Sequence, residues 1–184
     1  IAHRVLQTCG QVFRFAIATG KAQRDITADL RGALTTRTKT NYSRLKDSEL
    51  PEFFEKLENY DGEYQTKLAI KFLILTFVRT KELRGANWDG FDCANNQWHI
   101  PAERMKMRQK HIVPLSKQTL EIIAKLKNIN GDKKFLFPNI NNPSKTISEN
   151  TILYAIYRMG YHSRTTAHGF RGTASTILNE KGFN

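Results

Sequence analysis

A histidine and an arginine three residues apart could together bind a phosphate group. His168 and Arg171 follow a polar loop, residues 163–166, and open a helical pattern that continues to Glu180. This spacing places both side chains on one face of a helix, and the dipole and free N–H groups of a helix N-terminus attract anions. The pattern therefore indicates a phosphate site, although a histidine and an arginine on a solvated helix face would share it.

A second arginine stands where a mostly apolar stretch, residues 68–78, ends. Arg79 is followed three residues later by Glu82. An arginine at the end of a core helix either interacts with the helix dipole or is a cation aimed at a ligand. Glu82 could hold the guanidinium while its other donors remain available for a phosphate oxygen. A salt bridge with only a structural role is the alternative.

A third candidate is the basic connection at residues 103–110, between two expected strands. It contains Arg104, Lys106, Arg108 and Lys110. Such a hairpin tip is either a solvated loop or a device that reaches into a DNA groove. Lys106 lies between two methionines, and a partly desolvated lysine can donate a proton.

The composition points to a polyanion as partner. The 184 residues include 29 Lys and Arg against 17 Asp and Glu, which gives a net charge of +12. A basic protein of this kind is most simply a nucleic-acid binder. With 40% apolar residues the chain can bury a core, but no apolar run is long enough to span a membrane. The two cysteines form no disulfide framework, so a reducing cytoplasm is expected.

Several enzyme classes lack their motifs in this sequence. There is no glycine-rich phosphate loop, no nucleophile-elbow serine and no carboxylate, histidine or cysteine cluster at metal-ligand spacing. Asp89 and Asp92 have no third ligand beside them. We therefore expect phosphate chemistry without a metal or another cofactor.

These candidate residues need a scaffold, and the pattern divides the chain into three parts. Residues 2–19 form an amphipathic helix with nothing local to pack on, and residues 1–34 are interpreted as the end of a preceding helical domain. Residues 35–46 are predicted to be a basic linker. Residues 47–184 are predicted to be a compact domain.

The compact domain is predicted to be α+β and mostly helical. A helix begins near Pro51, and residues 68–78 are apolar almost all round, as in a central core helix. Three short β-type runs, residues 88–91, 97–100 and 111–115, predict a small antiparallel sheet. Further helices are predicted at residues 116–128, 148–160 and 166–181.

Four motifs in order resemble the tyrosine recombinase family, and more narrowly the phage and genomic-island integrases. The motifs are LTFVRTKELR from Leu75, WHIPAERMKM from Trp98, HIVPLS from His111 and AHGFR from Ala167, and the resemblance covers nearly the whole chain. The resemblance implies the integrase catalytic fold in residues 47–184 and the end of the core-binding domain in residues 1–34.

The resemblance also implies roles for individual residues. Arg79 and Arg171 would clamp the non-bridging oxygens of the scissile phosphate, and Glu82 would support Arg79. Lys106 would protonate the departing 5′ oxygen, while His168 would assist proton transfer or position the phosphate. Other basic residues are expected to contact DNA: Arg37, Lys39, Arg104, Arg108, Lys110 and Arg164.

Enzymes of this family cut and rejoin DNA through a 3′-phosphotyrosine intermediate, without ATP or metal. No tyrosine follows His168, whereas Tyr154, Tyr157 and Tyr161 precede it, and the helical spacing of the first two favours packing residues. We therefore expect a catalytic domain truncated before its nucleophile and inactive as it stands. The implied partners are double-stranded attachment-site DNA, other protomers in a tetramer, and accessory DNA-bending or excision factors. The implied location is the bacterial cytoplasm, at the nucleoid, where the enzyme integrates or excises a prophage or genomic island.

Two other functions remain open. A non-catalytic DNA-binding module would keep the basic surface without the chemistry. An enzyme similar to type IB topoisomerases would use related groups only to relax supercoils, although the residues around Arg79 and Lys106 favour an integrase.

Overall fold

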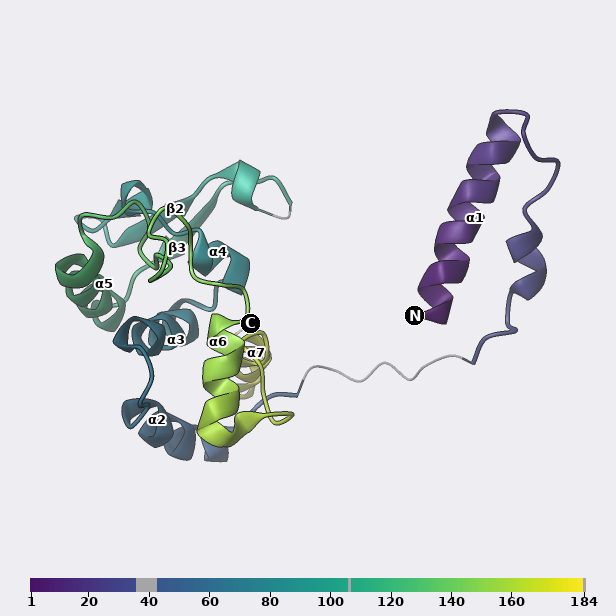
Figure 1. Ribbon diagram of the computed structural model, residues 1–184. Helices are drawn as coiled ribbons and strands as arrows, with labels where there is room; N and C mark the ends of the chain where they lie inside the picture. Colours follow the sequence, from purple (N-terminus) through teal and green to yellow (C-terminus); the bar gives the residue numbers. More distant parts are fainter. Residues whose placement is uncertain (36–42, 106, 184) are drawn as a thin grey trace. The chain divides into compact units, whose positions relative to one another are not determined.

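The computed structural model describes residues 1–35, 43–105 and 107–183, in two compact units, Ile1–Asn41 and Tyr42–Asn184. In unit 1, helix α1 (Ala2–Ala18) is followed by a 3-10 turn, Ile26–Leu30 (Figure 1). The Asp25 side chain caps this turn by accepting a hydrogen bond from the Thr27 N–H. The turn packs on α1, so the helix does have a local partner.

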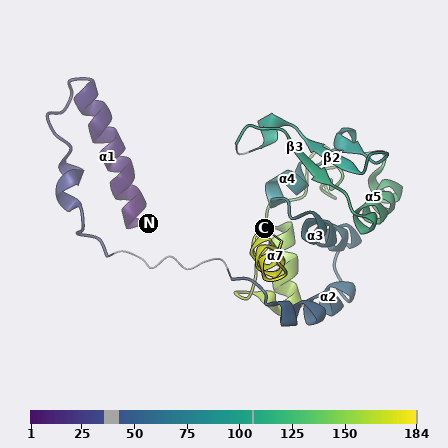
Figure 2. The ribbon, with the colours of Figure 1, turned by 180° about the vertical axis from the view of Figure 1, so that it is seen from behind.

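Unit 2 is built around the buried helix α3 (Tyr64–Thr76). Its buried side chains include Leu68, Ile70 and Phe72, whereas Tyr64 and Leu75 are exposed, so the helix is central but is open to solvent along one side. Helices α5 (Lys117–Asn130) and α6 (Thr151–Ile156) pack against it (Figures 1 and 2). The remaining helices are α2 (Leu50–Glu58), α4 (Thr80–Arg84) and α7 (Gly169–Glu180).

The three-stranded sheet is antiparallel, in the order β1 (Phe91–Asp92), β2 (Gln97–Ile100), β3 (His111–Pro114). Trp98 is paired with Phe91 on one side and Val113 on the other. The Trp98 ring is fully buried, stacks on Phe91 at 5.2 Å and meets Phe72 of α3 edge-on at 5.7 Å. These contacts fasten the sheet to α3 and confirm the predicted α+β architecture.

Element boundaries differ from prediction where the backbone changes conformation. Residues 88–90 form a 3-10 turn, so the first strand holds only two residues. The predicted helix 148–160 is α6 followed by a π turn, Tyr157–Tyr161, in which Gly160 has φ = 88°. That positive φ suits glycine and breaks the helix. The last helix begins at Gly169 rather than at residue 166.

The predicted linker also differs at its C-terminal end. Residues 36–42, which include Arg37 and Lys39, lie outside the described residues. Leu45, however, is only 2% exposed and belongs to the core of unit 2. The Thr173 hydroxyl of α7 donates a hydrogen bond to the Leu45 carbonyl over 2.9 Å. The compact unit therefore includes residues that their polar sequence assigned to the linker.

In the described part of the chain, no helix combines the length and the apolar character that crossing a membrane requires.

Candidate nucleic-acid interface

Arg79 lies at the start of a helix, not at the end of one as predicted. Helix α3 ends at Thr76 because Phe77 adopts a left-handed conformation, with φ = 51°. The chain then turns through buried Val78, and Arg79 becomes the residue that precedes α4. This placement brings Glu82 into the first turn of α4, where a carboxylate is favoured by the helix dipole.

Glu82 holds Arg79 by two hydrogen bonds. Its carboxylate accepts one from the Arg79 backbone N–H at 2.8 Å and one from the Arg79 guanidinium Nη1 at 2.6 Å. The Glu82 side chain is 4% exposed, whereas that of Arg79 is 42% exposed. The predicted pairing is therefore present, with the carboxylate buried beneath a guanidinium that remains partly open to solvent. Such charge-assisted bonds fix the fork and leave other donors for a ligand.

Arg104, which was expected to contact DNA, instead binds the backbone of Glu82 with its side chain. Its guanidinium Nη2 donates to the Glu82 carbonyl at 2.6 Å. The guanidinium also lies over Gly85, where an added Cβ would stand 2.5 Å from Nη2. Burial lowers the pKa of Arg104, and the Glu82 charge partly offsets this. Arg104 thus ties the strand connection to α4.

Arg171 approaches the Arg79 region from the far end of the sequence. The Arg171 guanidinium Nη1 donates a hydrogen bond to the carbonyl of Phe77, two residues before Arg79. This bond joins the first turn of α7 to the α3–α4 turn. Two arginines that are 92 positions apart in the sequence are therefore held at one place in the fold.

His168 is exposed and immediately precedes α7. The backbone contribution to an anion site is smaller than the sequence suggested. The Gly169 N–H already donates to Thr166, and the Arg171 N–H donates to the His168 carbonyl. An anion at this end of α7 would therefore depend mainly on side chains.

The connection between β2 and β3 projects from the sheet (Figure 1). Lys106 lies outside the described residues. Of its two neighbours, Met105 packs against the core, whereas Met107 is 75% exposed. Arg108 has a positive φ of 51°, and both it and Lys110 are exposed.

Arg164 is exposed to a similar degree as Arg79 but is engaged within the protein. Its guanidinium pairs with Glu49 at 2.8 Å and lies over the Tyr161 ring, 4.7 Å from the centroid. Glu49 raises the pKa of Arg164. Contact with DNA would have to compete with, or add to, this pair.

The tyrosines expected to pack differ from each other. Tyr157 packs against the core, but Tyr154 is 58% exposed, so its assignment as a packing residue was wrong. The helical spacing was right, but α6 presents that position to solvent.

Within residues 1–35, 43–105 and 107–183, no three His, Cys, Asp or Glu side chains are grouped as a metal site would require.

Two protein-family models match this chain. The Phage integrase family matches residues 43–184, and the Phage integrase central domain matches residues 1–33.

The chain belongs to the phage integrase family.

Curated relatives of this family include phage enzymes. The integrase of Enterobacteria phage P4 is 39% identical over 99% of this chain and 45% of its own length. The integrase of Shigella phage Sf6 is 37% identical over 97% of this chain and 47% of its own. The chain thus spans about half the length of the relatives it matches, and the resemblance stated from the motifs is confirmed.

Solved integrases share the fold. A lambda integrase dimer bound to a COC′ core site has a TM-score of 0.74 at 19% identity, over 97% of this chain and 51% of that one. A lambda integrase tetramer bound to a Holliday junction has a TM-score of 0.72 at 20% identity, over 97% and 54% of the two chains.

Two features of the site escaped sequence analysis. The bond from Arg171 to the Phe77 carbonyl depends on the left-handed turn at Phe77, a conformation unusual for a bulky residue. The seat of Arg104 on Gly85 joins residues of different elements. In the sequence, Gly85, three residues after Glu82, was the only local indication that another side chain approaches α4 closely.

Proposed function

We propose that this protein is part of a site-specific DNA recombinase, an integrase that cuts and rejoins DNA through a 3′-phosphotyrosine intermediate. Membership of the phage integrase family supports this function. We assign residues 1–34 to the core-binding domain, residues 35–46 to a linker and residues 47–184 to the catalytic domain, with residues 43–46 packed onto the latter.

The observation that carries the proposal is that Arg79 and Arg171 are both anchored by hydrogen bonds at the α3–α4 turn. Each guanidinium is held by one protein acceptor and has further N–H donors for a ligand. A phosphodiester undergoing attack develops charge on its non-bridging oxygens, and preoriented donors stabilise that charge with little reorganisation. The two arginines would clamp these oxygens, with Glu82 as support.

The remaining roles concern proton transfer. The departing 5′ oxygen needs a proton, and Lys106 on the β2–β3 connection would supply it. His168, beside Arg171 at the start of α7, would assist proton transfer or position the phosphate. The attacking group would be the tyrosine that the 3′-phosphotyrosine intermediate requires.

The proposed substrate is double-stranded attachment-site DNA of a prophage or genomic island. The exposed cations Arg108 and Lys110 would contact its backbone, as would Arg37, Lys39, Arg104 and Arg164. The lambda integrase tetramer on a Holliday junction supports further protomers as partners. Accessory DNA-bending or excision factors are proposed as well, and the place of action would be the nucleoid in the bacterial cytoplasm.

The test uses the full-length polypeptide and a nicked duplex that carries its attachment site, with EDTA present. Denaturing gels should show a covalent protein–DNA adduct. The adduct should disappear in Arg171→Ala and persist in Lys125→Ala, which removes an exposed cation from α5.

Salt-sensitive DNA binding without an adduct on any attachment site would contradict recombinase chemistry. It would favour a DNA-binding module without catalysis. An adduct that survives in Arg171→Ala would contradict the phosphate clamp.

A further inference from the structure

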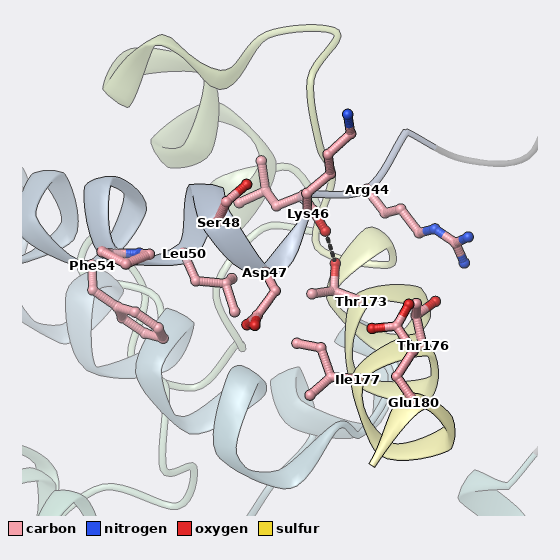
Figure 3. Close-up of a pocket in the computed structure, with 12 residues that line it drawn as sticks. Arg44, Lys46, Asp47, Ser48, Leu50, Phe54, Thr173, Thr176, Ile177 and Glu180 are labelled. Atoms are coloured by element: carbon pink, nitrogen blue, oxygen red, sulfur yellow. Dashed lines mark hydrogen bonds between the residues drawn. The ribbon is translucent and has the colours of Figure 1, made fainter. Parts of the chain in front are cut away.

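The extended segment before α2 is seated directly on helix α7. A Cβ added to Gly169 would lie 2.6 Å from the Ser43 carbonyl oxygen and 3.6 Å from the Arg44 Cα. The Leu45 carbonyl accepts the hydrogen bond from Thr173 (Figure 3). The backbone of Arg44 is thus fixed on both sides, because only a glycine at residue 169 permits so close an approach.

The Arg44 side chain continues along α7. Its Cδ lies 3.3 Å, and its Nη1 3.9 Å, from the position that a Cβ of Gly172 would occupy. Figure 3 shows the side chain extending away from Asp47 and Leu50. The stem is therefore packed on the helix while the guanidinium stands beside Gly172, the neighbour of Arg171.

This guanidinium has no hydrogen bond or ion pair with any residue that the structure describes. Asp47 and Glu180 line the same pocket of about 1050 Å³, yet neither pairs with it. Apart from Arg108 at the tip of the β2–β3 connection, the other arginines of unit 2 have acceptors within the protein: Arg79, Arg84, Arg104, Arg158, Arg164 and Arg171. Arg44 is thus a held but unpaired cation.

Its surroundings at the start of α7 suit an anionic ligand. The N-terminal half of α7 carries the positive end of the helix dipole, and Arg171 adds a full charge there. A further positive group at this place makes an anion a favourable ligand.

We propose that Arg44 binds a backbone phosphate of the DNA, next to the phosphate that Arg79 and Arg171 clamp. This inference rests on the proposed function because it extends the same DNA site along α7. The stem rests against Gly172 while the residue as a whole is exposed, so the guanidinium is open to a phosphate.

Salt dependence of DNA binding tests the proposal with the 184-residue protein and a short duplex. Removing one phosphate contact should reduce the slope of log K against log salt by about 0.9, which is about an eightfold loss of affinity at roughly 0.1 M salt. We expect this change in Arg44→Gln, which keeps most of the stem. Arg44→Lys should retain the wild-type slope, and so should the control Lys125→Ala.

Thermal unfolding of each variant separates a loss of contact from a loss of fold. A wild-type slope in a folded Arg44→Gln would overturn the role of Arg44 and leave the proposed function standing. An Arg44→Lys variant that lost the slope would also overturn it, because lysine keeps the positive charge that the phosphate contact requires. Absence of salt-dependent binding by the wild type would overturn the proposed function and this inference together.

Discussion

Two basic regions of unit 2 differ in how their cations are held. At the α3–α4 turn, Arg79 is bonded to Glu82 and Arg171 to the Phe77 carbonyl. At the tip of the β2–β3 connection, Arg108 and Lys110 are exposed and have no side-chain hydrogen bond to the described residues. Both regions are positive, but only the first has a fixed geometry.

This difference in geometry indicates different roles for the cations of the two regions. A guanidinium that is already oriented can stabilise charge at one place in a transition state, because no reorganisation is needed. An exposed cation on a turn contributes mainly long-range attraction to phosphates, which salt screens. Substitutions at the turn should therefore affect chemistry or folding, and substitutions at the tip should affect binding.

The largest effect is expected for Arg171→Lys. Lysine keeps the charge but cannot bond the Phe77 carbonyl and a phosphate through one planar fork. Single-turnover cleavage by the full-length polypeptide should fall about 10²- to 10³-fold, the usual loss for one such donor. DNA affinity should change far less. Equal losses of cleavage and affinity would remove the distinction between the two regions.

Glu82→Gln tests the support beneath Arg79. The neutral amide weakens two bonds to Arg79 in a buried setting, so the free energy of unfolding should fall by about 1–3 kcal/mol. Urea denaturation measures this. Glu103→Gln, an exposed acid near the tip, is the matched control and should be within about 0.5 kcal/mol of wild type. Similar values for both variants would mean that the turn is not specially anchored.

The glycines of α7 provide a second, graded test of packing. Gly169→Ala places a Cβ 2.6 Å from a backbone oxygen that cannot easily move, and should destabilise by about 1–3 kcal/mol. Gly172→Ala meets only the flexible Arg44 side chain at 3.3 Å, and should cost less. Thermal melts compare the two. A reversed order would contradict the seating of residues 43–45 on α7.

At the tip, Arg108→Gly should leave folding intact, because glycine accepts the positive φ at that position. The variant should reduce the salt slope of DNA binding by about 0.9, as should Lys110→Ala. Fluorescence anisotropy over a salt series measures both. Unchanged slopes would show that the tip does not meet DNA.

The smallest effect concerns Glu49, the acid that engages Arg164. A backbone hydrogen bond from Lys46, and then the Arg164 guanidinium, lower the pKa of Glu49 below 4.5. Because the folded-state pKa is the lower one, Glu49 stabilises the fold above about pH 4.5, and this is lost as the pH falls through the lowered value. Acid titration of Glu49→Gln should show a slightly weaker pH dependence in this range than wild type. An unaltered titration would mean that the pair adds no stability.

Sequence patterns predicted the parts of the fold that depend on local periodicity. The short β-type run at residues 97–100 placed β2 correctly, and the apolar run at residues 68–78 predicted the central helix. The pairing of Arg79 with Glu82 followed from a spacing of three residues. These features are readable because each is decided within one turn or one strand.

Features that depend on tertiary packing were not readable. The end of α3 at Thr76, rather than near Arg79, comes from a left-handed residue inside an apolar run. The burial of Leu45 requires α7, which is more than a hundred residues away. Tyr154 was expected to be a packing residue but is exposed, because helical spacing alone does not decide which face of a helix meets solvent.

The central claim is that Arg79 and Arg171 act on the same phosphate. The direct measurement is a cycle in which the full-length polypeptide or its Arg171→Ala variant cleaves a duplex with either a normal or a neutral methylphosphonate group at the scissile position. If Arg171 acts on the non-bridging oxygens, Arg171→Ala should reduce the cleavage rate much less on the methylphosphonate duplex than on the normal duplex. Arg79→Ala should show the same difference between the two substrates. Equal losses on both substrates would contradict the account.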